Sequence, residues 1–96
     1  MKRQGDLVIK SVKELPKRLK EVKGGIILRG EATGHAHRLV GGDVFSGKDG
    51  LIYLMLAKAG SIVHDEHKPL NLKAGKYMVI RQREYQSKDM ARLVQD

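Results

Sequence analysis

Short apolar runs, separated by polar stretches that contain glycine, recur along the whole chain. The 96 residues include eleven glycines, and the apolar residues between them alternate with polar ones or form brief runs. This pattern is typical of short strands joined by turns. It predicts an all-β fold, mainly antiparallel, in the form of a small sandwich or barrel of about seven to nine strands.

The strand assignments follow from where the apolar residues fall. We expect strands at residues 7–12, 26–33, 35–40, 44–45, 51–56, 61–64, 70–72 and 77–85. In the first of these, Leu7 and Ile9 should occupy one face and Val8 and Val12 the other, since successive side chains of a strand point to opposite faces. The glycine-containing stretch 46–50 ends in Asp-Gly and predicts a hairpin between its flanking strands.

Two segments have helical features. Residues 88–95 follow Ser87, which can cap the start of a helix, and place apolar residues at helical spacing. We therefore expect a short C-terminal helix packed on the sheets. Residues 16–23 begin with a proline and end before two glycines, and Leu15, Leu19 and Val22 recur at the spacing of one helix face, which allows either a short helix or a basic loop.

Length and composition limit the class of protein. We expect a single domain spanning residues 1–96, because domains below about 50 residues rarely fold alone. The chain has no cysteine, which excludes disulfide scaffolds, thiolate zinc fingers, iron–sulfur clusters and cysteine nucleophiles. The longest apolar run, residues 51–57, is far shorter than the roughly 20 residues of a spanning helix. With no signal-peptide pattern at the start, we expect a cytoplasmic protein without membrane contact.

The most distinctive feature is that all four histidines fall in two tight pairs. His35 and His37 are two residues apart, so on a strand both imidazoles point to the same side of the sheet. His64 and His67 are three residues apart and can converge across a turn before Pro69. If the two segments are neighbours in the fold, the four rings can meet.

Such a cluster suits a divalent transition metal, namely zinc, iron(II), manganese, nickel or copper. The expected ligands are the four histidines, with Glu31 or Glu66 as an extra ligand or as a group that orients one. Without cysteine, an open site that keeps one position for water or substrate is favoured over a closed structural site. Two alternatives stay open at this point, namely separate surface or hydrogen-bonded histidines and a pH-responsive interface.

Two resemblances accompany these histidines. Gly30, His35 and His37, with His64 or His67, are similar to the histidine motifs of the cupins, small β-barrels that hold a metal on histidines. The resemblance covers roughly residues 30–80, and it implies a cupin-like barrel with a bound metal. The strings GEATGHAHRL and HDEHKPL, followed by RQREY, also resemble small uncharacterised prokaryotic and viral proteins, and that resemblance implies no activity.

The net charge of +8 is concentrated near the start of the chain. Residues 1–29 hold nine Lys/Arg against three Asp/Glu. This segment, together with Arg81, Arg83 and Tyr85 on one strand face, is the basis of a rival hypothesis, a non-enzymatic basic adaptor for nucleic acid or a protein partner. The alternative for both regions is solvated surface. A homo-oligomer joined through exposed strand edges is a further expectation.

Overall fold

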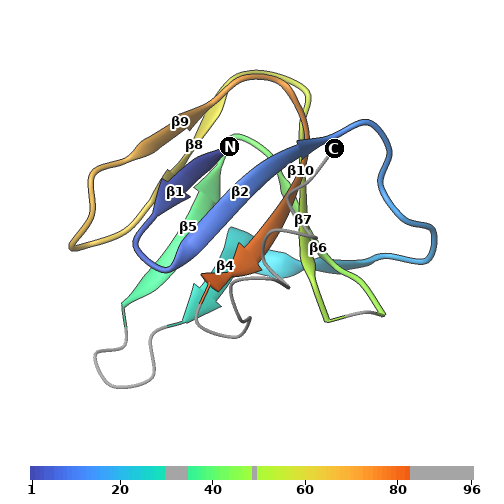
Figure 1. Ribbon diagram of the computed structural model, residues 1–96, viewed down its shortest axis with the longest axis horizontal. Helices are drawn as coiled ribbons and strands as arrows, with labels where there is room; N and C mark the ends of the chain where they lie inside the picture. Colours follow the sequence, from blue (N-terminus) through green and yellow to red (C-terminus); the bar gives the residue numbers. More distant parts are fainter. Residues whose placement is uncertain (30–34, 49, 83–96) are drawn as a thin grey trace.

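The fold consists of two antiparallel sheets, as seen in a computed structural model that describes residues 1–29, 35–48 and 50–82 (Figure 1). In spatial order, the six-stranded sheet contains β1 (Lys2–Gln4), β2 (Leu7–Val12), β10 (Gly75–Arg81), β7 (Ile52–Leu56), β6 (Asp43–Ser46) and β3 (Lys20–Val22). The four-stranded sheet contains β4 (Ile26–Arg29), β5 (Ala36–Val40), β8 (Gly60–Val63) and β9 (Leu70–Leu72). The all-β prediction is confirmed. The described residues form ten strands, more than expected, because three-residue strands such as β1 and β3 are too short to show a pattern.

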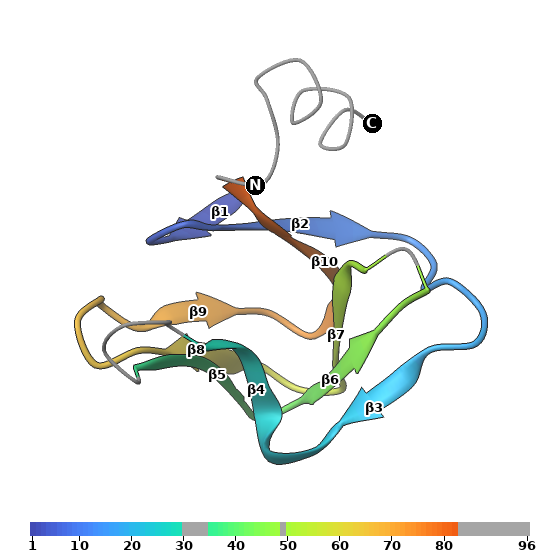
Figure 2. The same ribbon diagram turned by 90° about the horizontal axis from the view of Figure 1, so that it is seen from below.

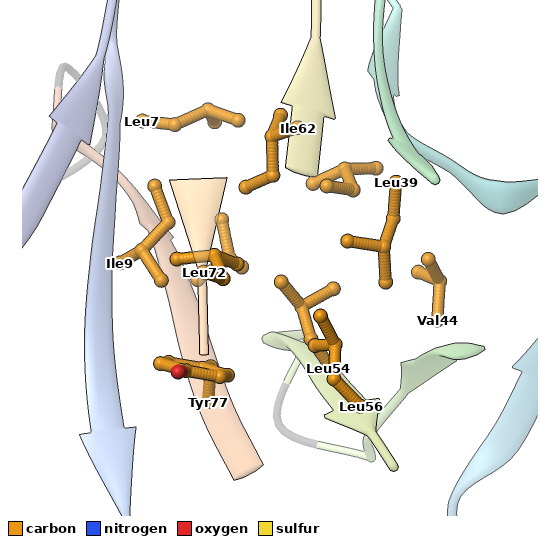
Figure 3. Close-up of a cluster of buried hydrophobic side chains, with 11 residues drawn as sticks. Leu7, Ile9, Leu39, Val44, Leu54, Leu56, Ile62, Leu72 and Tyr77 are labelled. Carbon is orange, nitrogen blue, oxygen red and sulfur yellow. The ribbon is translucent and has the colours of Figure 1, made fainter. Parts of the chain in front are cut away.

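The main hydrophobic core lies between the two sheets, which face each other in Figure 2. Leu7 and Ile9 of β2 contribute from one sheet, and Leu39 and Ile62 of β5 and β8 from the other (Figure 3). The predicted alternation of β2 is confirmed, since Val8 belongs to a second apolar cluster, outside the main core. The two sheets therefore form a sandwich whose six-stranded layer carries apolar side chains on both faces.

The predicted hairpin is present between β6 and β7, which pair from Asp43↔Met55 to Ser46↔Ile52. Its loop is closed by two backbone hydrogen bonds. The Gly47 N–H donates to the Leu51 carbonyl at 3.0 Å, and the Gly50 N–H donates to the Gly47 carbonyl at 3.1 Å. Gly50 has φ +80°, a conformation that favours glycine.

The helix considered for residues 16–23 is wrong. Residues 20–22 form β3, which pairs with β6, and residues 23–25 form a single 3₁₀ turn, η1 (Lys23–Gly25). Val22 packs against the main core, whereas Leu15 and Leu19 pack against the second cluster. The spacing that resembled one helix face therefore serves two different faces of the sheets.

The longest of the described strands, β10, ends at Arg81, whereas the sequence suggested a strand that continues to residue 85. Arg83, Tyr85 and the predicted helix at 88–95 lie outside the described residues. Among the described residues, no helix is long and apolar enough to cross a membrane.

Candidate metal-binding site

The two histidine pairs meet at one end of the four-stranded sheet. His35 immediately precedes β5 and His37 lies within it, while His64 and His67 lie in the turn between β8 and β9. β5 pairs with β8 in the register Arg38↔Val63. This register places His37 and His64, each one residue beyond this pair, next to each other. The two histidine segments are therefore neighbours in the fold.

Three of the rings form a compact group, which we call the inner histidines (His37, His64 and His67). Their ring centroids are 4.4 Å apart for His37 and His64, 4.6 Å for His64 and His67, and 5.9 Å for His37 and His67. Imidazoles that bind one ion at N–metal distances of about 2 Å in tetrahedral geometry have centroids about 5 Å apart. The spacing of the inner histidines is therefore that of rings able to share an ion.

His37 is the most buried histidine, with 6% of its surface exposed, and Gln4 fixes its orientation. The Gln4 Nε2 group donates to the carbonyl oxygens of Ile62 and Lys68, both at 2.9 Å. Gln4 Oε1 is thereby left as the acceptor for His37 Nδ1, at 2.8 Å. In the neutral ring the proton is then on Nδ1, and Nε2 keeps a lone pair for a ligand.

Burial and neighbouring charge both favour the neutral form of His37. Desolvation by burial and, to a smaller extent, positive charge on His64 and His67 together lower its pKa from 6.5 to about 4, against the opposite effect of Asp6. His37 is therefore neutral at pH 7. Neutral imidazole is the form that binds metals.

The other inner histidines are not yet turned toward a common point. The Glu66 backbone N–H donates to His64 Nδ1 at 3.0 Å, so a neutral His64 carries its proton on Nε2. His67 is exposed, and its Nε2 faces Gly5, where a β-carbon would lie only 2.7 Å away. Accordingly, no three His, Asp or Glu side chains among the described residues are already arranged to hold an ion. To hold an ion together with His37, the His64 and His67 rings would have to turn.

His35 lies at the rim of the cluster. Its ring meets that of His64 edge-on, with centroids 5.8 Å apart. Its Nδ1 is 2.8 Å from Glu66 Oε1, and its Nε2 is 3.6 Å from Asp65 Oδ2. Glu66 thus contacts His35, one of the predicted ligands, whereas Glu31 lies outside the described residues.

Two residues of this site were missed by sequence reasoning, namely Gln4 and Gly5. Both precede β2 in a short, charged N-terminal stretch that contains no motif. Gly5 has φ +57° and lies against His67. The pairing of β1 with β2 brings this turn beside the histidines, and no local pattern in the sequence predicts that arrangement.

The predicted nucleic-acid contact is only partly described. Arg81 Nε lies 3.3 Å from Asp6 Oδ2, and the Arg81 side chain is 19% exposed. Its guanidinium is therefore engaged in an ion pair within the fold and is largely covered. Arg83 and Tyr85 lie outside the described residues.

Fold and site together define a small two-sheet β protein with a histidine cluster at one end of its smaller sheet. A family model described as a domain of unknown function, DUF8820, matches residues 3–82. The chain therefore belongs to this family, and the matched range includes all four histidines and Gln4. No curated protein and no solved structure matches the chain.

Proposed function

We propose that the histidine cluster binds one divalent transition metal ion. The inner histidines supply three nitrogen ligands, and His35 occupies the fourth position at the rim, where water or a small ligand can replace it. The observation that carries the proposal is the convergence of the inner histidines, from two separate segments, to centroid distances of 4.4 to 5.9 Å.

The chemistry of the donors limits the class of metal. Neutral imidazoles without thiolates suit zinc, iron(II), manganese, nickel or copper, and they do not replace the oxygen ligands that calcium and magnesium require. His37 supports this assignment, because it is neutral at pH 7 and keeps a lone pair on Nε2. Binding through His64 Nε2 would require the ring proton to move to Nδ1, which would break the hydrogen bond that Nδ1 accepts from the Glu66 N–H.

The test is metal uptake by untagged protein that has been purified without nickel resin and stripped with chelator. We expect about one zinc or cobalt(II) ion per chain by mass spectrometry after dialysis, with visible cobalt bands typical of nitrogen ligands. His64→Gln should abolish uptake, and Lys48→Gln, an exposed change in the β6–β7 loop, should leave it intact. Failure of the wild type to take up any of the five metals overturns the proposal.

The cupin resemblance is a narrower hypothesis. It rests on a metal held by histidines of an antiparallel β fold, and it predicts that the bound metal keeps an exchangeable position. Binding of azide or another small anion to the cobalt(II) form, seen as a change in its visible spectrum, would support it. An unchanged spectrum at saturating anion would contradict it.

A second candidate function, polyanion binding, rests on the basic segment, which we define as residues 10–23. Its cations at positions 13, 17, 18, 20 and 23 are exposed, and such a surface binds phosphates through release of counterions. Binding of a polynucleotide that weakens steeply with salt, and that His64→Gln leaves unchanged, would favour this function. Absence of binding at low salt would exclude it.

A further inference from the structure

The first strand, β1, is short but firmly placed. Among the described strands it pairs only with β2, from Lys2↔Ile9 to Gln4↔Leu7, at the edge of the six-stranded sheet. Lys2 and Arg3 are exposed, whereas Gln4 is 4% exposed. A three-residue edge strand has few backbone hydrogen bonds, so the contacts of the Gln4 side chain contribute much to its position.

The Gln4 amide connects three segments of the other sheet. It donates to Ile62 of β8 and to Lys68 in the turn that carries His64 and His67, and it accepts from His37 of β5. Each end of a buried polar amide must find a partner, and here both N–H groups and the oxygen do so. Gln4 therefore joins the two sheets at the point where the histidines meet.

We propose that Gln4 is a positioning residue that couples metal binding at the histidine cluster to the docking of β1. The inference rests on the proposed function and adds a regulatory element to the same site. Gln4 holds the proton of His37 on Nδ1, which turns Nε2 toward the other inner histidines. Through Lys68, it also holds the turn that supplies His64 and His67.

The coupling follows from two physical arguments. A hydrogen bond from the distal N–H of a metal-bound imidazole fixes the ring and makes it a better ligand. An ion on Nε2 in turn makes Nδ1–H a stronger donor to Gln4, so that the ion also stabilises the docked strand. By linkage, docking of β1 strengthens metal binding by the same factor by which the bound ion strengthens the docking of β1.

Two substitutions separate the two tasks of the Gln4 amide. Gln4→Met keeps the length of the side chain and removes all three hydrogen bonds. Gln4→Glu keeps an acceptor for His37 Nδ1 and loses the donors to Ile62 and Lys68. Arg3→Met is the matched control, since Arg3 is the exposed neighbour on the same strand and donates a hydrogen bond to the exposed Gln82 side chain.

The measurement is the zinc dissociation constant, by competition with a chromophoric chelator, together with the melting temperature of the zinc-free protein. We expect Gln4→Met to weaken zinc binding by about 10- to 100-fold and Arg3→Met to change it less than about threefold. Gln4→Glu should melt earlier than wild type and yet bind zinc about as tightly. Equal loss of affinity in Gln4→Met and Gln4→Glu would reduce Gln4 to a structural residue and overturn the inference.

The wild type alone provides a second test, which remains decisive if a Gln4 variant does not fold. Nitrogen NMR of the histidine rings should show the His37 proton on Nδ1 before and after zinc is added. Hydrogen exchange of the β1 amides should slow on zinc binding. A proton on Nε2, or β1 exchange unaffected by bound zinc, overturns the inference while leaving the proposed function standing. A wild type that binds no metal overturns both.

Discussion

The histidine cluster and the basic segment gather functional side chains in opposite ways. The cluster takes residues from β5 and from the β8–β9 turn, and Gln4 of β1 ties them together. The basic segment takes its cations from one continuous stretch of chain, and most of them are exposed. The fold thus assembles the histidine cluster from separate segments, whereas the basic segment is one exposed stretch of the sequence.

This difference decides what each region can do. A metal ion needs donors placed to within a few tenths of an ångström, which requires supporting contacts such as those of Gln4. A polyanion needs only positive charge near its phosphates, which exposed lysines supply without fixed geometry. The following experiments are arranged from the largest expected effect to the smallest.

Lowering the pH should lower the stability of the folded protein through His37. Its pKa is lowered from 6.5 to about 4 in the fold, so between these pH values the unfolded chain binds more protons than the folded one. The free energy of unfolding is therefore unaffected by the titration of His37 above about pH 6.5, and it falls by about 3 kcal/mol as the pH is lowered from 6.5 toward 4. Urea denaturation across this range measures it.

His37→Gln is the matching variant for this experiment, since it keeps a donor for Gln4 and removes the titrating ring. We expect its stability to depend less on pH between 6.5 and 4 than that of wild type. The basic segment contains no histidine and should contribute little in this range. Identical pH profiles for wild type and variant would contradict the assignment.

Two glycine substitutions compare backbone strain at the two regions. Gly5 has φ +57° and Gly24, just after the basic segment, has φ +82°, so alanine at either position should lower stability by about 1–2 kcal/mol. Only at Gly5 does the new β-carbon meet His67, and nothing lies within 4 Å of it at Gly24. Gly5→Ala should therefore also weaken zinc binding, and Gly24→Ala should not. Equal zinc affinity in both variants would show that the contact of His67 with Gly5 does not affect zinc binding.

His35 at the rim and the inner histidines should differ in how much each contributes to zinc binding. His35 faces Glu66 and Asp65, which are exposed, and such pairs contribute less than about 1 kcal/mol to stability. We expect His35→Gln to weaken zinc binding far less than His64→Gln does, because an exchangeable water can fill the fourth position. Calorimetric titration with zinc measures both, and an equal loss in the two variants would make His35 a full ligand.

The smallest effect on stability is expected in the basic segment. Lys17→Gln and Lys20→Gln replace exposed side chains, so each should change the free energy of unfolding by less than about 0.5 kcal/mol. If the segment binds polynucleotides, each change should lower the slope of log affinity against log salt by about 1. Unchanged binding in both variants would show that the segment is only a solvated surface.

Part of this molecule was predictable because its signals are local. Alternation placed Leu7 and Ile9 on one face of β2 and Val8 on the other, and the Asp-Gly stretch marked the β6–β7 hairpin. The spacing of Leu15, Leu19 and Val22 misled, because the same period arises when a chain turns from one sheet face to another. A short helix and an irregular turn differ in their tertiary contacts more than in their local pattern.

In the candidate site, too, some features were predictable from the sequence and others were decided by tertiary contacts. The sequence alone indicated the four histidines as the chemically distinctive residues, since two tight pairs stand out whatever the fold. That His37 and His64 are neighbours was decided by the register of β5 on β8, and the role of Gln4 by the docking of β1. Residue types and short spacings can be read directly from the sequence, whereas contacts between segments tens of residues apart form only when the sheets pack.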